Sequence, residues 1–291
     1  MRVLSLFDGI SCGMVALERA GISVEQYSAY EINKYAIQIS QKNYPNIEQK
    51  GDVTHTDFSE YAGFDLLIGG SPCQDLSIIQ SADRAGLNGR KSRLFYFYLQ
   101  ALNTVKPKYF LFENVASMKK ECQDIITHEI GVEPIMIDSA LVSAQDRKRF
   151  YWTNIPDITQ PENKDIVLEN IILPAEKVPD KYWYHNRTFT LYEGDVKIRA
   201  MLNLGNSYAQ VQRVYDLKHK CGTLCGDGAG GNLQKKVYQN GMVRKLTPVE
   251  YERLQTLPDN YTAGVADSRR YTAIGNAWTV DVIAHILKGI L

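Results

Sequence analysis

Short apolar runs alternate with segments of helical periodicity over the first half of the chain. The runs predict strands at residues 3–7, 25–30, 64–68, 109–112, 134–138 and 150–153. Between the first two runs, residues 14–20 predict a helix that ends at Gly21, and residues 94–105 predict another that ends before Pro107. This alternation is typical of βαβ units and predicts an α/β fold with a doubly wound, mostly parallel sheet.

The pattern changes at about residue 173. Prolines and a glycine-rich passage over residues 222–231 replace regular periodicity, which predicts a smaller, loop-rich, mainly β module. Order returns after Arg244, where residues 248–257 and 279–291 predict two helices. We therefore expect one domain from residues 1–172 plus 244–291, and a second from residues 173–243.

Composition and charge are those of an ordinary globular protein. Of 291 residues, 44% are hydrophobic and 23% charged, and the formal net charge of +0 argues against indiscriminate binding of polyanions. No apolar stretch approaches the roughly 20 residues of a membrane span, and the first residues do not resemble a signal peptide, so we expect a cytoplasmic location. Five scattered cysteines indicate reduced thiols, and no metal site is expected.

The loop after the first predicted strand, Phe7-Asp8-Gly9-Ile10-Ser11-Cys12-Gly13, leads into a helix. Its glycines allow tight turning and close approach of a ligand to the backbone. Glu31 ends the second predicted strand and Asp52 ends a possible third, which suits a cofactor that carries adenosine. These positions do not separate a dinucleotide from S-adenosylmethionine. The glycine spacing departs from G-x-G-x-x-G, which makes a hydride-transfer enzyme the less favoured alternative.

A thiol and a carboxyl group follow two other predicted strands. Pro72-Cys73 comes after residues 64–68, and Glu113-Asn114 comes directly after residues 109–112. Ligands of open α/β sheets bind beyond the carboxyl ends of the strands, so a nucleophile and a proton donor would meet in one crevice. A cysteine after proline is more often a structural thiol, and its companions decide the interpretation.

Those companions form a series of motifs. Gly70-Ser71-Pro72-Cys73-Gln74, Phe112-Glu113-Asn114-Val115 and Gln145-Asp146-Arg147-Lys148-Arg149 resemble the DNA cytosine-5 methyltransferase family. The match continues through residues 244–250, 253–255 and 274–276, in the family's order. The resemblance implies a Rossmann-like fold that uses S-adenosylmethionine, a module for target recognition, and transfer of a methyl group to cytosine C5 in double-stranded DNA. It also implies a specific short target sequence, base flipping and a covalent cysteine adduct.

The resemblance assigns catalytic roles by motif position. Cys73 would add to cytosine C6, because C5 accepts a methyl group only after such an addition. Glu113 would hold N3 and the exocyclic amine as a protonated carboxyl, and Arg149 would donate to O2. Arg147 and Gln145 would support the catalytic loop and nearby backbone, and Asn114 would brace the Pro-Cys turn.

The resemblance also assigns a pocket for the cofactor. The implied residues are Phe7, Asp8, Gly9, Ile10, Cys12, Gly13, Glu31, Ile32, Asp52, Val53, Pro72, Leu94, Asn276, Ala277 and Trp278. Asp52 would accept from adenine N6, with Ile32 and Val53 on the two faces of the ring. Ser11 stands where the family usually has glycine, and Trp278 where a small aliphatic residue is more frequent. Both departures are similar to the vertebrate de novo branch.

Contacts to DNA are expected in two segments. Residues 74–92 suit a loop that closes over the duplex, with Ile79 and Gln80 as the wedge and Arg84 and Lys91 on phosphates. Sequence choice is expected in the smaller module, where Thr223-Leu224 and the following glycines resemble family recognition elements. The candidates there are Arg213, Thr223, Leu224, Gly230, Gly231 and Lys235.

The chain carries no added regulatory domains, so we expect a bacterial or phage enzyme that acts as a monomer on DNA. A cognate restriction endonuclease is a possible companion that need not bind it. Three alternatives remain: a tRNA cytosine-5 methyltransferase, disfavoured by the absence of a Cys-Phe-Thr tripeptide; a catalytically silent DNA-binding regulator; and the nicotinamide-dependent dehydrogenase.

Overall fold

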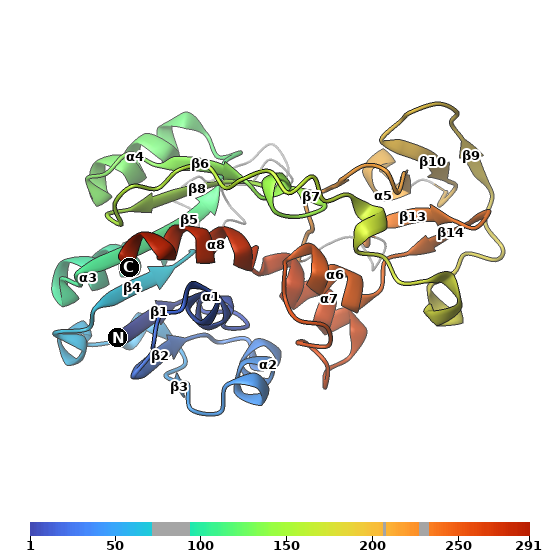
Figure 1. Cartoon of the computed structure of the whole chain (residues 1–291). Helices are drawn as coiled ribbons and strands as arrows, with labels where there is room; N and C mark the ends of the chain where they lie inside the picture. Colours follow the sequence, from blue (N-terminus) through green and yellow to red (C-terminus); the bar gives the residue numbers. More distant parts are fainter. Residues whose placement is uncertain (72–93, 206–207, 227–232) are drawn as a thin grey trace. The chain divides into compact units, whose positions relative to one another are not determined.

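The computed structural model describes residues 1–71, 94–205, 208–226 and 233–291, and within it the chain forms two compact units (Figure 1). The first unit comprises Met1–Asp138, Lys148–Pro161 and Val280–Leu291. The second comprises Ser139–Arg147 and Glu162–Thr279, and so includes residues 173–243. Each unit is described by itself below.

A seven-stranded, mostly parallel sheet forms the centre of the first unit. Its strands, in spatial order, are β3 (Glu48–Gln49), β2 (Gln26–Tyr30), β1 (Arg2–Leu6), β4 (Leu66–Gly69), β5 (Tyr109–Val115), β8 (Lys148–Thr153) and β6 (Ile135–Asp138). The strands from β3 to β5 pair in parallel, whereas β8 runs antiparallel between β5 and β6. The predicted α/β class with a mostly parallel sheet is confirmed.

Helices cover both faces of this sheet. They are α1 (Cys12–Ala20), α2 (Lys34–Asn43), α3 (Phe95–Val105), α4 (Lys120–Ile130) and α8 (Val280–Leu287). On β4, Leu67 packs in the cluster that contains α3, while the next residue, Ile68, lies directly against Gly13 of α1. Successive residues of a strand point to opposite faces, so α1 and α3 lie on opposite sides.

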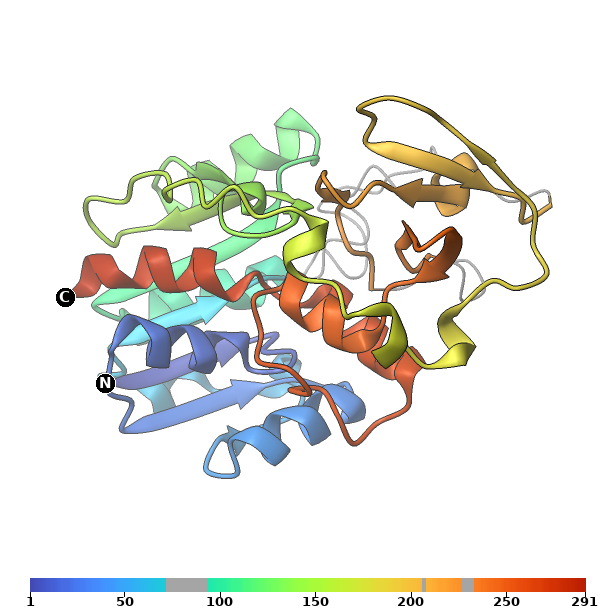
Figure 2. The ribbon, with the colours of Figure 1, turned by 45° about the vertical axis from the view of Figure 1, so that its right-hand side comes forward.

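The end of the chain returns to its beginning. Figures 1 and 2 show α8 alongside α1, and Arg19 of α1 pairs with Asp281 of α8 at 2.7 Å. Apolar residues dominate α8, where all but two of its eight side chains are buried. Helix α8 therefore lies beside α1 in the same layer of helices. For this reason the first unit contains both ends of the chain.

The second unit is built around an antiparallel-rich sheet of five strands. They are β14 (Met242–Lys245), β13 (Lys236–Gln239), β11 (Arg213–Tyr215), β10 (Ile198–Leu202) and β9 (Phe189–Leu191), in that order. A two-stranded pair joins β7 (Gln145–Asp146) to β12 (Cys221–Gly222). The helices are α5 (Ala209–Gln212), α6 (Pro248–Leu254) and α7 (Asp267–Asn276).

Local sequence explains several element ends. Gly21 terminates α1 in the left-handed conformation with φ 78°, as predicted. Thr247 and Glu250 form a capping box at the start of α6, with Pro248 in the first turn. Helices α2, α4 and α7 were not predicted, and β5 continues to Val115 because β8 pairs alongside it. Glu113 and Asn114 thus lie within a strand rather than after it.

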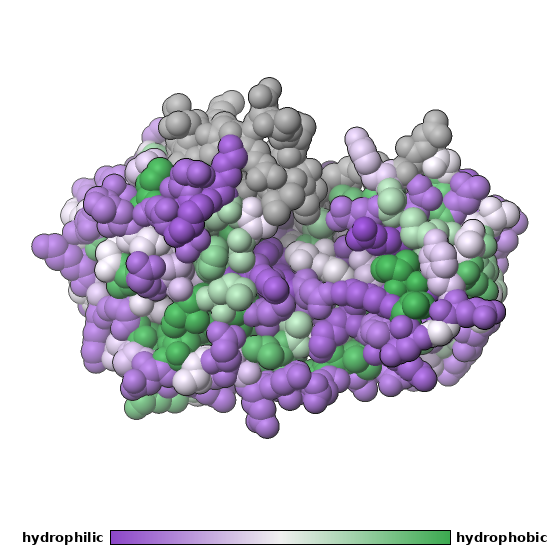
Figure 3. All heavy atoms as spheres, turned by 90° about the horizontal axis from the view of Figure 1, so that it is seen from above, coloured by the Kyte–Doolittle hydropathy of each residue, from purple (hydrophilic) through white to green (hydrophobic). Residues whose placement is uncertain are grey.

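Hydrophilic residues predominate on the face seen in Figure 3, with apolar residues in separate patches. Among the described residues, no helix has the length and apolar character needed to cross a membrane. The same residues contain no group of three His, Cys, Asp or Glu side chains arranged to hold a metal ion.

Candidate functional site

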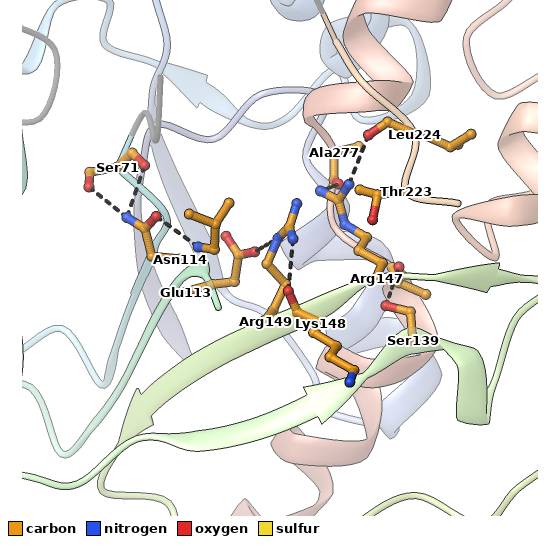
Figure 4. A network of polar contacts seen from close by, with 12 residues as sticks. Ser71, Glu113, Asn114, Ser139, Arg147, Lys148, Arg149, Thr223, Leu224 and Ala277 are labelled. Atoms are coloured by element: carbon orange, nitrogen blue, oxygen red, sulfur yellow. Dashed lines mark hydrogen bonds and ion pairs between the residues drawn. The ribbon is translucent and has the colours of Figure 1, made fainter. Parts of the chain in front are cut away.

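Glu113 and Arg149 form an ion pair on the first unit's sheet. The register places Arg149 of β8 opposite Val115 of β5, so Arg149 and Glu113 are diagonal neighbours on one face. Arg149 Nε lies 2.8 Å from Glu113 Oε1, and their side chains are 12% and 11% exposed. Figure 4 shows the two groups pointing toward each other. Arg149 Nη1 donates to the Lys148 carbonyl at 2.8 Å, which fixes the guanidinium plane.

Asn114 connects this pair to the end of the neighbouring strand. Its Oδ1 accepts from the Val115 amide at 2.8 Å, and its Nδ2 donates to the carbonyl and hydroxyl of Ser71 at 3.4 and 3.3 Å. Ser71 immediately precedes Pro72 and Cys73, which lie outside the described residues. The residue that follows Glu113, Asn114, therefore hydrogen-bonds to Ser71, the residue directly before Pro72 and Cys73.

Arg147 belongs to the second unit and holds backbone there. It is 4% exposed. Its Nη2 donates to the Ala277 carbonyl at 2.9 Å, and its Nη1 reaches the carbonyls of Leu224 and Gly275 at 3.3 and 3.4 Å (Figure 4). One guanidinium therefore joins the Thr223-Leu224 segment to the end of α7.

Gln145 makes a second set of buried contacts in the same unit. Its Nε2 donates to the Leu254 carbonyl at 2.6 Å and to Gln255 Oε1 at 2.8 Å. Gln255, which the sequence interpretation did not single out, in turn donates to the carbonyls of Ile274 and Ala277 at 2.9 and 3.0 Å. Its place in the motif Arg253-Leu254-Gln255 was the only signal in the sequence.

The loop after β1 is a tight turn with several residues in the left-handed region. Phe7, Gly9 and Ser11 all have positive φ, at 59°, 61° and 59°. Glu31 Oε2 accepts from the Gly9 amide at 2.9 Å, and its Oε1 accepts from the amides of Ile32 and Asn33, both at 2.8 Å. Burial raises the pKa of Glu31, and the hydrogen bonds from these amides oppose that rise.

Hydrophobic and acidic side chains beside this loop suit an adenosine. Ile32 is 73% exposed, which is unusual for isoleucine, whereas Val53 is buried. Asp52 lies beyond β3 rather than at a strand end, and it caps the short 3₁₀ helix Val53–His55 by accepting from the Thr54 amide at 2.9 Å. That hydrogen bond lowers the pKa of Asp52, which keeps its carboxylate ionised and able to accept from an amine.

The remaining cofactor candidates divide between the units. Ile10, Cys12 and Gly13 are buried in the first unit, where Leu94 is half-buried. A Cβ on Gly13 would lie 2.3 Å from Ile68 Cδ1, so a larger residue there requires the Ile68 side chain to move. Asn276, Ala277 and Trp278 lie at the end of α7 in the second unit. Gly226 and Gly275 allow the backbones to meet there: a Cβ on Gly275 would lie 2.3 Å from the Cys225 carbonyl.

The DNA candidates have varied environments. Arg213 is exposed, whereas the side chains of Leu224 and Lys235 are 1% and 6% exposed. Thr223 Oγ1 donates to the Asp146 carbonyl at 2.6 Å. The candidates Ile79, Gln80, Arg84, Lys91, Gly230 and Gly231 lie outside the described residues.

A mostly parallel α/β sheet and the similarity to known proteins place this chain in the methyltransferase class. The chain belongs to the C-5 cytosine-specific DNA methylase family, whose model matches residues 1–291. It is 26% identical over 317 residues to the type II methyltransferase M1.ScrFI of Lactococcus lactis subsp. cremoris, covering 100% of this chain and 78% of that protein. It is 34% identical over 181 residues to the orphan methyltransferase M.Rho11sI of Bacillus phage rho11s, covering 58% of this chain and 35% of that one.

Solved structures show the same fold. A putative DNA modification methyltransferase encoded within an E. coli prophage superposes with a TM-score of 0.69 at 19% identity, covering 100% of this chain and 98% of its own. The Entamoeba histolytica methyltransferase EhMeth superposes with a TM-score of 0.76 at 16% identity, covering 100% and 97%. The predicted family is confirmed, and the chain is a DNA cytosine-5 methyltransferase.

Proposed function

We propose that this chain methylates cytosine within a specific short sequence of double-stranded DNA, with Glu113, Arg149 and Cys73 around the flipped base. The observation that carries the assignment of residues is the Glu113–Arg149 pair, held at 2.8 Å on neighbouring strands. Asn114, next to Glu113, bonds to Ser71 directly before the Pro-Cys turn. These two sets of contacts, Glu113 with Arg149 and Asn114 with Ser71, support the proposed grouping of the three side chains.

The Arg149 guanidinium has three partners in this proposal. Its Nε holds Glu113 and its Nη1 holds the Lys148 carbonyl, which directs Nη2 toward the pyrimidine O2. Glu113 then presents its carboxyl to N3 and the exocyclic amine of the same ring edge. Two neighbouring groups with fixed geometry would hold the base without reorganisation, which is how preorganised sites lower barriers.

Cys73 supplies the electrons that make C5 reactive. Its sulfur bonds to C6, the C5=C6 π electrons move toward N3 and O2, and a proton reaches N3 from Glu113. C5 then takes the methyl group; a base removes the C5 proton, and the electrons of that C–H bond reform C5=C6 as sulfur leaves and Glu113 regains the proton from N3. Cys73 is thereby freed, Glu113 regains its starting proton, and the base passes the C5 proton to water.

S-adenosylmethionine supplies the electrophilic methyl group and leaves as S-adenosylhomocysteine. In the first unit, Glu31 would hold the ribose, Asp52 the adenine amine, and Ile32 one face of the ring. The exposed Ile32 side chain and the positive-φ turn at Gly9 fit such a ligand, because both present surface that the fold itself leaves uncovered. We assign Asn276, Ala277 and Trp278 to the same cofactor.

Residues 173–243 would recognise the target sequence. Their strands give a rigid sheet from which exposed side chains such as Arg213 can reach the duplex. The buried Leu224 and Lys235 would act by shaping the glycine-rich segment rather than by touching bases. Ile79 and Gln80 are proposed to fill the space of the flipped base, with Arg84 and Lys91 on phosphates.

We further propose that the protein acts as a monomer in the cytoplasm, on DNA of a bacterial or phage-infected cell, and needs no bound endonuclease. A genome-wide map of conversion-resistant cytosines tests the function. A host expressing the chain should gain methylated cytosines in one short motif, Cys73→Ala should abolish them, and the matched control Cys122→Ala, a buried thiol in α4, should retain them. Methylation of RNA alone would overturn the DNA assignment, and no methylation at all would indicate a silent binder.

A further inference from the structure

Ser11 adopts a backbone conformation that favours glycine. It precedes α1 with φ 59° and ψ 39°, in the left-handed region, where an L side chain is strained. Serine at this position often caps a helix by accepting from a backbone amide, yet Ser11 makes no side-chain capping bond. Its side chain is fully buried instead. Something other than helix capping must therefore hold Ser11 in this conformation.

The Asp8 carboxylate accepts hydrogen bonds from three hydroxyl groups. Ser11 Oγ donates to Asp8 Oδ2, while Ser5 Oγ and Tyr27 OH donate to Oδ1 at 2.6 and 2.7 Å. Burial raises the pKa of Asp8, and the three hydroxyl donors oppose that rise. A buried carboxylate with three donors from β1, β2 and the loop is a built polar cluster.

The cluster extends to α2 and β3. Ser11 Oγ also lies 2.6 Å from Ser40 Oγ, which accepts from Gln49 Nε2 at 3.0 Å. Tyr27 OH lies 2.8 Å from the point that a Cβ on Gly13 would occupy. The Tyr27 hydroxyl, which donates to Asp8, therefore also leaves little room for a side chain at position 13 in the first turn of α1.

A second carboxyl holds the same loop from its other end. Glu31 accepts from the Gly9 amide at 2.9 Å, while Asp8 accepts from the Ser11 hydroxyl two residues later, so the two carboxyl groups hold different residues of the loop. Among the residues that the structure describes, none lies within 4 Å of a Cβ built on Gly9, so none of them covers this side of the turn.

We propose that Asp8, acting through the Ser11 hydroxyl, is a positioning residue that holds the Gly9-Ile10-Ser11 backbone in the shape that receives the cofactor. This rests on the proposed assignment of S-adenosylmethionine to the loop. Ser11 takes the place of a glycine because a side-chain hydrogen bond compensates the strain of its left-handed backbone. Ser11 itself makes no contact with the cofactor through its side chain.

Calorimetric binding of S-adenosylhomocysteine to the full chain tests the proposal. Asp8→Ala should raise the Kd at least tenfold, because Ser11 then relaxes out of the left-handed region. Adding Ser11→Gly should recover most of that loss, because glycine adopts the same backbone conformation without the hydrogen bond. The control Asp57→Ala, which removes an exposed aspartate that caps a 3₁₀ helix, should leave the Kd within about twofold.

Three results would overturn the inference. These are an unchanged Kd for Asp8→Ala, a double variant as weak as Asp8→Ala alone, and a Ser11→Gly single variant that binds tenfold more weakly. If Asp8→Ala does not fold, Asp8→Asn with and without Ser11→Gly gives the same comparison. If the unaltered chain binds no S-adenosylhomocysteine, the proposed function fails instead.

Discussion

Two arginine–glutamate pairs in this chain have nearly the same contact distance and different surroundings. Arg244 and Glu250 lie 2.6 Å apart with both side chains fully buried, and a second bond at 2.9 Å makes the contact bidentate. In the other pair, Arg149 Nε and Glu113 Oε1 lie 2.8 Å apart, and the side chains are 12% and 11% exposed.

The partners of each pair explain the difference. Glu250 also accepts from the amides of Thr247 and Leu173, and Arg244 Nε donates to Gln239 Oε1 at 2.6 Å. Every contact of that pair joins one part of the second unit to another. The pair of Arg149 and Glu113 instead lies on a sheet face with solvent access, beside the strand that leads to Cys73. A fully enclosed pair maintains the fold, whereas a partly open one is available for chemistry.

The largest effect is expected from Glu113→Gln. Glutamine keeps the size of the side chain but cannot exchange a proton with N3, so kcat should fall about 10³-fold. Transfer of labelled methyl groups to DNA measures this rate. The Tm should change by less than about 4 °C, equivalent to under about 1 kcal/mol in a chain of this size. A variant that retains more than a tenth of kcat contradicts the catalytic role.

Glu250→Ala should show the opposite result: a large loss of stability with little change in kcat. Removing one partner leaves a buried, uncompensated guanidinium and should lower the free energy of unfolding by about 3 kcal/mol or more. Urea denaturation followed by circular dichroism measures the loss. The folded fraction of this variant should retain near-normal kcat at low temperature. If the variant is as stable as the unaltered chain, the proposed difference between the two pairs is contradicted.

Arg149→Lys tests the role of the arginine in the partly exposed Glu113–Arg149 pair. Lysine keeps the charge near Glu113 but cannot bind the carboxylate, the Lys148 carbonyl and a base oxygen at once. We expect kcat to fall about 10- to 100-fold with little change in Tm. Arg269→Lys is the matched control, because it changes an exposed arginine on α7 in the other unit, and its kcat should stay within about threefold. Equal losses in both would contradict a specific role for Arg149.

The smallest effect is a pH dependence of stability that depends on Lys236, a buried lysine on β13, next to β14. Its Nζ donates to the carbonyls of Val211 and Gln234, and burial, then the charges of Lys245 and Lys235, lowers its pKa to about 7. Between pH 7 and about 10.5 the unfolded chain therefore holds a proton that the folded chain has released. The free energy of unfolding should rise with pH in this window, by at most about 1.4 kcal/mol per pH unit.

Lys236→Met should lack that rise, and the difference between the two chains isolates it from other titrating groups. Urea midpoints at pH 7, 8 and 9 provide the measurement. Parallel pH dependence in both chains would show that Lys236 stays protonated when folded.

The fold followed from the sequence where a local signal was strong. Apolar runs located the strands of the first unit, and Gly21 and Pro248 marked helix ends. Helix α2 was missed because its sequence KYAIQISQKN is largely polar and only three of its residues are buried. Tertiary packing, not periodicity, decides such a helix.

The site was less accessible to sequence reasoning. The spacing of Gln145, Arg147 and Arg149 gave one motif, but the first two residues brace the second unit while Arg149 pairs with Glu113 in the first. The left-handed backbone of Ser11 also has no signal in the sequence except a missing glycine. Both features depend on contacts between residues far apart in the chain, so spacing alone cannot show them.

Covalent capture tests the central claim most directly. A duplex with 5-fluorocytosine at the mapped target cytosine, mixed with S-adenosylmethionine, should form a complex with the unaltered chain that survives denaturation, because fluorine blocks loss of the C5 substituent. Glu113→Gln should form it far more slowly, Arg269→Lys at the normal rate and Cys73→Ala not at all. Absence of the complex with the unaltered chain, or its persistence in Cys73→Ala, would contradict the account.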